Sequence, residues 1–466
     1  MNQTAFSSQK LHPDLLKNLS SLGYTEMTPI QAQSLPSILE GKDVIAQGKT
    51  GSGKTAAFAL GLLNKLNVKQ FRVQTLVLCP TRELADQVAK EIRRLARAIH
   101  NIKVLTICGG MPFGPQIGSL EHGAHIIVGT PGRVEEHVRK ETLRLDHLTT
   151  LVLDEADRML DMGFQPSLDA IVEKIPVKRQ TLLFSATYPD QIQSISQRIM
   201  VDPVIAKATS THDKTTIQQH FFKVDDDKQR LTALRLLLMK YRPESSVVFC
   251  NTKRETQEVA DELANYGFSA VALHGDLEQR DRDQALVRFA NKSISVLVAT
   301  DVAARGLDIE ALDAVINYQL ARDSEVHIHR IGRTGRAGSK GIACSLYSER
   351  EHHKIALLED YLDQLIVAEQ LPPIHLLEKT PLTSSMETLQ IDGGKKQKVR
   401  AGDILGALTG KDGGENSIPG TAVGKINISD NWAYVAVSRD VYKVALQKLG
   451  QGKLKGRSFR VRLIRD

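Results

Sequence analysis

The 466-residue sequence contains only four cysteines, and none of them forms a CxxC pair or lies at zinc-ligand spacing from a histidine. Cys79, Cys108, Cys250 and Cys344 are widely separated, and each lies in or beside an apolar run typical of a strand. This pattern excludes a disulfide framework and a zinc ribbon. It predicts four buried, reduced and inert thiols.

Long apolar runs are also missing. No stretch approaches eighteen consecutive apolar residues, which is about the length that a membrane-spanning helix requires. The opening residues MNQTAFSSQKLHPDLL lack the basic and then apolar layout of a signal peptide. We therefore expect a cytoplasmic protein.

Most of the chain has no excess charge of either sign. Residues 386–466 hold 15 lysines and arginines against 8 aspartates and glutamates, a difference equal to the formal net charge of +7 of the whole chain. A basic footprint in one region indicates a polyanionic partner. We expect nucleic acid rather than membrane, because no basic amphipathic helix with a broad apolar face accompanies the charge. The alternative is a basic tail that only improves solubility.

The first two thirds of the chain have an alternating organisation. Apolar runs such as TLVLCP, HIIVGTP and QTLLFSAT, and later VVFCNT and GIACSLY, alternate with longer helical patterns, as in βαβ units around a parallel sheet. With a 41% hydrophobic content, this length suggests about three domains. We predict an α/β fold of two tandem parallel-sheet domains, followed by an α+β domain. The predicted bounds are 1–207, a linker at 208–216, 217–369, a Pro- and Ser/Thr-rich linker at 370–385, and 386–466.

The last eighty residues have a different order of elements. ETLQID, the helical AGDILGALTG, TAVGKINI, WAYVAVS, the helical VYKVALQKL and SFRVRLIRD give βαββαβ. This order predicts a split-βαβ sandwich.

A candidate phosphate loop follows the first predicted strand. DVIAQGKTGSGKT is an apolar strand that runs into GxxxxGKT and then into an apolar helical pattern, which is the context that this motif requires. Glycines let backbone N–H groups approach phosphate oxygens, and the helix N-terminus adds a favourable dipole. The predicted loop comprises Gly48, Lys49, Thr50, Gly51, Ser52, Gly53, Lys54 and Thr55. Lys54 is expected to reach the terminal phosphates and Thr55 to ligate magnesium.

A second candidate motif, which is acidic, follows the buried strand at 150–153. Asp154 and Glu155 stand at its carboxyl end, where ligands of open α/β sheets bind. We expect Asp154 to hold magnesium through water, and Glu155 to orient and activate the attacking water. The alternative is a strand that ends in a capped, solvated helix start.

Arginines recur every three residues in HIHRIGRTGRAG, at Arg330, Arg333 and Arg336. One helical turn is expected to align them. Guanidinium groups that reach phosphate from a second domain would make hydrolysis depend on domain closure. A solvated basic helix is the alternative, but the glycines between the arginines disfavour it.

In order along residues 6–338, these motifs resemble those of the DEAD-box ATP-dependent RNA helicases. Phe6 and GYTEMTPIQ, with Tyr24 and Gln31, resemble the Q motif (4–32), in which an aromatic stacks on adenine and glutamine reads its edge. AQGKTGSGKT and DEAD (154–157) resemble motifs I and II. The resemblance implies two RecA-like domains that bind ATP and Mg²⁺ and close on RNA.

The same resemblance assigns further roles. SAT resembles motif III, which implies that Ser185, Ala186 and Thr187 couple hydrolysis to strand separation. Asp308 is implied to contact ribose, and Arg333 and Arg336 to be arginine fingers. The implied RNA contacts of the two domains are Pro80, Thr81, Arg82, Glu83, Gly109, Gly110, Thr130, Pro131, Gly132, Arg133, Arg254, Gln279, Arg282, Thr300 and Gly306. Contacts to backbone and 2′-OH groups cannot read sequence.

The tail resembles an RNA-recognition motif, whose sheet stacks bases on aromatics. Alternation puts Trp432 and Tyr434 on one face and Ala433 toward the core, but Gln390 stands where an aromatic is common. The basic residues Lys453, Lys455 and Arg457 can track phosphates beside or instead of the sheet. Core packing of Trp432 is the alternative.

Such a tail resembles modules that direct family members to a hairpin of 23S ribosomal RNA. This implies a monomeric helicase that acts on pre-50S particles during assembly of the large ribosomal subunit. Two alternatives stay open. One is a cold-shock or RNA-decay helicase, for which a long charged tail is expected. The other is an ATP-gated RNA clamp without useful unwinding.

Overall fold

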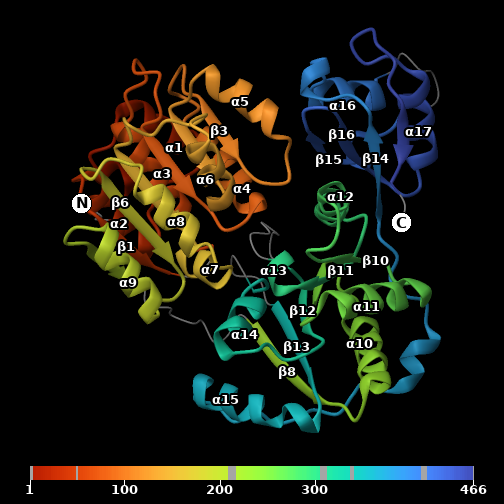
Figure 1. Ribbon diagram of the computed structural model, residues 1–466. Helices are drawn as coiled ribbons and strands as arrows, with labels where there is room; N and C mark the ends of the chain where they lie inside the picture. Colours follow the sequence, from red (N-terminus) through yellow and green to blue (C-terminus); the bar gives the residue numbers. More distant parts are fainter. Residues whose placement is uncertain are drawn as a thin grey trace. The chain divides into compact units, whose positions relative to one another are not determined.

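Figure 1 shows the computed structural model of the chain, which describes residues 4–48, 51–207, 217–304, 312–335, 341–410 and 417–464. The described residues form three sheets of seven, six and four strands. The predicted site residues Lys49, Thr50, Gly306, Asp308 and Arg336 lie outside the described residues, as does the predicted linker 208–216.

The first sheet is parallel and has the strand order β3-β4-β2-β5-β6-β1-β7. Its strands are β1 (Val44–Gln47), β2 (Thr75–Leu78), β3 (Val104–Ile107), β4 (Ile126–Gly129), β5 (Thr150–Asp154), β6 (Gln180–Ser185) and β7 (Val204–Lys207). Its helices are α1 (Pro13–Ser21), α2 (Pro29–Leu39), α3 (Lys54–Lys65), α4 (Arg82–Leu95), α5 (Phe113–Glu121), α6 (Pro131–Arg139), α7 (Ala156–Asp161), α8 (Gln165–Val172) and α9 (Asp190–Ile199).

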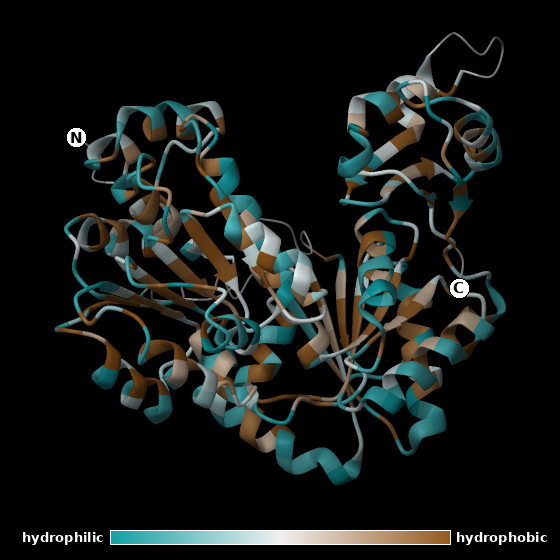
Figure 2. Cartoon of the chain, turned by 45° about the horizontal axis from the view of Figure 1, so that its top comes forward, coloured by the Kyte–Doolittle hydropathy of each residue, from teal (hydrophilic) through white to brown (hydrophobic). Residues whose placement is uncertain are grey.

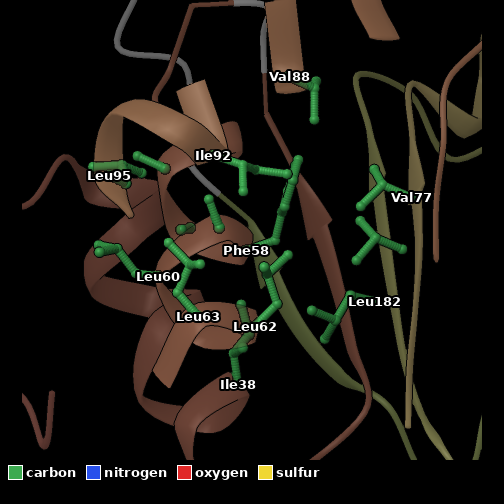
Figure 3. Packing of buried hydrophobic residues seen from close by; sticks show 14 of the residues in the cluster. Ile38, Phe58, Leu60, Leu62, Leu63, Val77, Val88, Ile92, Leu95 and Leu182 are labelled. Carbon is green, nitrogen blue, oxygen red and sulfur yellow. The ribbon is translucent and has the colours of Figure 1, made fainter. Parts of the chain in front are cut away.

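Both faces of this sheet are covered, as in other parallel sheets. Successive residues of a strand point to opposite faces, so Val152 lies in one core cluster while Leu151 and Leu153 lie in the other. In Figure 3, Phe58 and Leu62 of α3 pack toward Val77 of β2 and Leu182 of β6. Side chains of α4 extend the same cluster: Val88, Ile92 and Leu95.

The second sheet is also parallel, with the order β10-β11-β9-β12-β13-β8. Its strands are β8 (Ile217–Lys223), β9 (Ser246–Cys250), β10 (Ala270–Leu273), β11 (Val296–Thr300), β12 (Ala314–Asn317) and β13 (Gly341–Tyr347). Its helices are α10 (Asp227–Tyr241), α11 (Lys253–Asn265), α12 (Gln279–Ala290), α13 (Asp301–Ala304), α14 (Ser324–Ile331) and α15 (His352–Leu362). In Figure 2 the strands are largely hydrophobic and the outer helices carry hydrophilic residues.

The third sheet is antiparallel, with the order β15-β16-β14-β17. Its elements are β14 (Met386–Ile391), α16 (Ala401–Thr409), β15 (Val423–Ile428), β16 (Ala433–Ser438), α17 (Tyr442–Gln451) and β17 (Val461–Leu463). Ala433, Val435 and Val437 of β16 enter a core shared with both helices. The predicted βαββαβ order and the three-domain fold class are therefore confirmed.

Several details differ from the sequence predictions. The strands β7 and β8 were not predicted, because β7 has four residues and β8 carries Gln218, Gln219 and His220 in place of an apolar run. The predicted linker 370–385 contains a short 3₁₀ helix, Ile374–Glu378, whose Leu376 and Leu377 pack against the second domain's core.

The four cysteines are free and buried, as predicted. Burial raises the pKa of the Cys108 thiol to about 12, which keeps it protonated and inert. Among the described residues, no helix combines the length and the apolar character needed to cross a membrane.

Candidate functional site

The strand-to-helix turn after β1 is built around glycines. Gly48 donates its N–H to the Ser185 carbonyl at 3.0 Å, which ties the loop to the neighbouring strand β6. Gly53 has φ +91°, and a Cβ there would stand 2.5 Å from Gln31 Nε2, so only glycine fits. Lys54 is buried, and its ammonium donates to the Gly48 carbonyl. The described part of the loop therefore has the curled backbone that a phosphate loop requires.

The segment before α2 braces this loop through two side chains. Thr28 Oγ1 donates to the Ser52 carbonyl at 2.7 Å, and Gln31 Nε2 donates to the Gly53 carbonyl at 3.0 Å. Gln31 Oε1 accepts from the Thr28 backbone N–H at 2.8 Å, which closes a capping box at the start of α2. The predicted Gln31 thus contacts the phosphate loop directly.

The two predicted aromatics lie together. Phe6 is only 2% exposed and meets the half-buried Tyr24 edge to face, with 6.2 Å between ring centroids. Arg94 Nη2 donates to the Tyr24 hydroxyl at 2.6 Å, and that hydroxyl donates to Glu91 at 3.3 Å. Phe6 therefore packs in the core of the first domain against Tyr24, and Tyr24 is held by α4.

The carboxyl end of β5 presents two buried carboxylates. Asp154 is 3% exposed, and burial raises its pKa to about 7, against the lowering effect of the Lys54 charge. Glu155 is 8% exposed and adopts the left-handed conformation, with φ 52° and ψ 53°, at the N-cap of α7. Such strained backbone in a residue other than glycine is often found at functional sites.

Asp157 connects this acidic motif to the end of β6. Its Oδ2 atom accepts from the Ala186 N–H at 3.2 Å, the Thr187 N–H at 3.1 Å and the Thr187 hydroxyl at 3.1 Å. Ser185 is buried, and its hydroxyl has no hydrogen-bond partner within the described ranges. The predicted coupling segment is thus fastened to the acidic motif by one carboxylate oxygen.

Oxygen donors near the phosphate loop fit a hard divalent cation. Thr55 lies in the first turn of α3, and burial raises the pKa of the Asp154 carboxyl although the charge of Lys54 lowers it. Among the described residues, no group of three His, Cys, Asp or Glu side chains forms a metal cage. Magnesium usually takes one or two protein ligands together with phosphates and water, so Thr55 and Asp154 fit this ion.

The predicted RNA residues of the first domain lie along the same carboxyl edge of the sheet, beside a different set of strands. They follow β2, β3 and β4, which are neighbours in the order β3-β4-β2. Thr81 caps α4 by accepting from the Leu84 N–H at 3.2 Å, and Thr130 accepts from the Gly109 N–H at 3.4 Å. Arg133 donates to the Met111 carbonyl at 2.8 Å. Of the remaining predicted residues of this edge, Pro80 and Gly110 lie in the connections after the strands. The others are the first two residues of α4, Arg82 and Glu83, and of α6, Pro131 and Gly132.

In the second domain, four predicted RNA residues follow the ends of β9, β10 and β11, which are again adjacent strands. Arg254 is an exposed residue in the first turn of α11 and pairs with Glu258 at 2.7 Å. Gln279 and Arg282 belong to the first turn of α12, and Thr300 ends β11. The polar edge of this sheet therefore repeats the arrangement in the first domain.

The expectation that one helical turn aligns three arginines is wrong. α14 ends at Ile331, so Arg333 lies in the turn that follows. Arg330 is 2% exposed and directs all five guanidinium donors to protein acceptors. Two of these bonds reach the Asp301 carboxylate, at 2.6 and 2.8 Å, and the others reach Asn251, Asn317 and the Gln319 carbonyl. Arg330 is thus a structural residue, which the buried environment explains.

The predicted RNA residues of the tail divide into two groups. Tyr434 is 2% exposed, whereas Trp432 is half-buried and precedes β16. Lys453 and Arg457 are exposed. The Lys455 ammonium makes contacts within the domain: it pairs with Asp403 at 3.4 Å and donates to the Lys398 carbonyl at 3.1 Å.

Two site residues were missed by the sequence analysis. Thr28 braces the phosphate loop, and Asp157 holds the coupling segment. Both stand inside motifs that were recognised, TPIQ and DEAD, so their position was the available signal. Their partners come from segments distant in sequence, which the motifs do not specify.

Comparisons with known proteins agree with this geometry. The DEAD/DEAH box helicase family model matches residues 28–195, the helicase conserved C-terminal domain matches 229–338, and the DbpA RNA binding domain matches 388–463. The yeast helicase Dbp5 bound to RNA and ADP BeF3 is similar in structure, with a TM-score of 0.71 at 30% identity, covering 79% of this chain and 96% of that one.

Sequence relatives cover the chain further. The ATP-dependent RNA helicase DbpA of Escherichia coli (strain K12) is 54% identical over 99% of this chain and 100% of the relative. The DEAD-box ATP-dependent RNA helicase CshA of Geobacillus kaustophilus is 45% identical over 75% of this chain and 76% of the relative. The chain therefore belongs to the DEAD-box ATP-dependent RNA helicases, enzymes that bind RNA and hydrolyse ATP.

Proposed function

We propose that this helicase remodels 23S ribosomal RNA during assembly of the large ribosomal subunit. The observation that carries the proposal is the match of the DbpA RNA binding domain to residues 388–463, in a chain that is 54% identical to E. coli DbpA over its length. The same region holds the formal excess of positive charge. The protein would then act as a monomer on pre-50S particles in the cytoplasm.

We propose that ATP binds at the carboxyl edge of β1, β5 and β6. Lys54 and the backbone of Gly51, Ser52 and Gly53 hold the phosphates, and Thr28 and Gln31 brace the loop. Phe6, Tyr24 and Gln31 are proposed to recognise the adenine. Lys49, Thr50 and Asp308, which lie outside the described residues, are proposed to complete the nucleotide contacts.

Hydrolysis in this proposal depends on Glu155. Its carboxylate orients the attacking water and accepts the water proton. Asp154 and Thr55 would hold Mg²⁺, and the bound ion would supply positive charge beside the γ-phosphoryl oxygens. Arg333 and Arg336 from the second domain stabilise the charge that develops on them. Because these arginines belong to a different domain, turnover requires RNA-driven closure.

RNA contacts made by the two sheet edges do not discriminate between sequences. Thr81, Thr130 and Gly109 belong to turns at helix N-termini or strand ends, where backbone groups face phosphates. Ser185, Ala186 and Thr187, a segment in which Ala186 and Thr187 bond to Asp157, transmit the state of the nucleotide site to strand separation. Discrimination then comes from the C-terminal domain.

The test measures steady-state ATPase rates with 23S rRNA, 16S rRNA and homopolymer RNA. We expect strong preference for 23S rRNA, together with displacement of a short duplex. Replacing the exposed Lys453 and Arg457 with glutamate is expected to remove the 23S preference and to retain the rate at saturating homopolymer. A matched control replaces Lys443, an exposed lysine of α17. Equal stimulation by every RNA contradicts the 23S proposal.

A further inference from the structure

The C-terminal sheet buries both of its faces. Its inner face packs against α16 and α17, as the βαββαβ order requires. Residues of the outer face are also buried: Thr388 and Ala436 are 1% exposed, and Gln390 and Tyr434 are 2% exposed. An antiparallel sheet with helices on one side normally leaves its other face to solvent or to a ligand. Something in this chain therefore covers the outer face.

The cover is α12 of the second domain and the turn that follows it. Ser293 Oγ and Thr388 Oγ1 lie 2.6 Å apart, and Asn291 Nδ2 donates to Thr388 Oγ1 at 3.2 Å. Gln284 Nε2 of α12 donates to Gln390 Oε1 at 3.4 Å. These contacts hold β14, the central strand on which an RNA-recognition motif usually carries an aromatic.

Neighbouring strands join the same contact. Asn427 Nδ2 of β15 donates to Asn291 Oδ1 at 3.4 Å. Burial raises the pKa of Tyr434 on β16 to about 12, with Asp283 of α12 adding to the rise and a hydrogen bond to Gln284 opposing it. The contact therefore spans three strands and consists mainly of neutral amide and hydroxyl groups.

This contact accounts for the departure of the tail from a base-stacking sheet. Gln390 replaces an aromatic, and its amide bonds to Gln284 and to Asp392 instead of facing a base. Tyr434, the remaining aromatic, has its hydroxyl beside α12. Buried polar groups normally find hydrogen-bond partners, and here both partners come from the same chain.

We propose that the outer face of the C-terminal sheet is an intramolecular docking surface for α12 and the 291–293 turn, and that RNA binds elsewhere on this domain. α12 also carries Gln279 and Arg282 in its first turn. Docking therefore fixes the distance between an RNA held by the C-terminal domain and the strand held by the second domain. This last consequence rests on the proposed RNA function, whereas the docking itself does not.

A disulfide tests the docking in the full chain. Ser293→Cys combined with Thr388→Cys puts two sulfurs where oxygens lie 2.6 Å apart, close to the S–S bond length of about 2.05 Å. The four native cysteines are buried, so they compete little. The control pair is Ser293→Cys with Ser417→Cys, since Ser417 follows α16 on the opposite side of the sheet and donates to the Thr409 carbonyl. Disulfide formation is followed by thiol titration of the unfolded protein and by non-reducing electrophoresis.

We expect the test pair to oxidise completely and at least tenfold faster than the control pair. RNA affinity and RNA-stimulated ATPase of the oxidised protein should stay within twofold of the reduced protein. Failure to oxidise, in a variant whose reduced form retains ATPase, overturns the docking. A tenfold loss of RNA affinity that dithiothreitol reverses contradicts the proposal that RNA binds elsewhere on this domain. It would show that RNA binds the outer face of the sheet. If the disulfide forms in a protein that shows no preference for 23S rRNA, the docking stands and only the proposed function fails.

Discussion

Each of the two parallel-sheet domains buries a cationic side chain near a carboxylate. The two sites differ in how many hydrogen-bond and charge partners the buried groups have. In the first domain, Lys54 donates to the Gly48 carbonyl, and the pKa of Asp154 is raised to about 7 by burial. In the second, Arg330 meets both oxygens of Asp301 and uses its three other donors on neighbouring acceptors. The Asp154 carboxylate therefore has an incomplete set of partners when no ligand is bound, whereas every donor of Arg330 has an acceptor.

This difference shows why burial of charge alone does not identify a catalytic site. A buried carboxylate with an incomplete set of partners costs folding free energy and is retained where a ligand completes it. A buried ion pair with every donor satisfied is a structural element, and breaking it leaves an unpaired charge. The comparison predicts opposite consequences for changes at the two sites.

The largest effect is expected for Glu155→Gln in the incomplete site. The amide cannot accept a proton from water, so ATP turnover should fall about 10²–10⁴-fold, while ATP-dependent RNA binding persists. ATPase rates and RNA-binding isotherms measure the two properties. Glu121→Gln, at the end of α5, is the control and should keep its turnover. Normal turnover in Glu155→Gln would remove this residue from the reaction.

Arg330→Met tests the complete site. It leaves Asp301 partly buried without its cation, so the second domain should lose about 3–5 kcal/mol of unfolding free energy. Urea denaturation measures the loss. Arg330→Lys should be destabilised too, because lysine has three donors in place of five. The comparison predicts that Asp154→Asn in the first domain loses no stability in the ligand-free protein; a loss of similar size at both sites would break it.

Low pH is expected to destabilise the second domain through His327, which precedes Arg330 on α14. Burial, and next the charge of Arg330, lower the pKa of His327 to about 3. The unfolded histidine takes up a proton near pH 6.5, so stability present above pH 6.5 is lost as the pH falls toward 3. Between pH 7 and pH 5 this loss amounts to about 2 kcal/mol.

His327→Gln should reduce the difference in unfolding free energy between pH 7 and pH 5 by that amount. Glutamine retains a polar group for the contact with Gln219, at 3.4 Å in the native protein. Chemical denaturation at both pH values provides the measurement, and stability between pH 7 and pH 8 is the internal control. An unchanged pH difference would show that His327 is protonated in the fold.

The smallest effect is expected for Thr28→Val, which removes the hydroxyl that braces the phosphate loop. One neutral hydrogen bond contributes about 1 kcal/mol, so the KM for ATP should rise about fivefold with little change in kcat. Thr28→Ser keeps the hydroxyl and should bind ATP normally. If valine has no effect, the remaining contacts of the loop, among them that of Gln31 with Gly53, hold its conformation without the Thr28 hydroxyl.

The sequence predicted most of the fold, because the strands of the two parallel sheets are uninterrupted apolar runs between helices. β8 was not predicted because Gln218, Gln219 and His220 occupy strand positions, and their polarity resembles that of a loop. The arginine series was misjudged because spacing does not reveal burial. Arg330 and Arg333 look equivalent in the sequence, yet the helix ends between them.

Candidate site residues were identified where a motif carries its own chemistry, as in the phosphate loop and at Glu155. Residues that act by holding another segment were not. Thr28 and Asp157 bond to backbone groups 24 and 30 residues away, respectively. The cover over the outer face of the C-terminal sheet was not predicted for the same reason, since the partners of Thr388 and Gln390 lie 95 and 106 residues earlier.

The covered outer face of that sheet also limits how the enzyme can be re-engineered. A C-terminal domain grafted onto another helicase would bring Thr388, Gln390 and Tyr434 to a helix that lacks their partners. A functional graft must therefore carry α12 and the turn through Ser293 together with the domain.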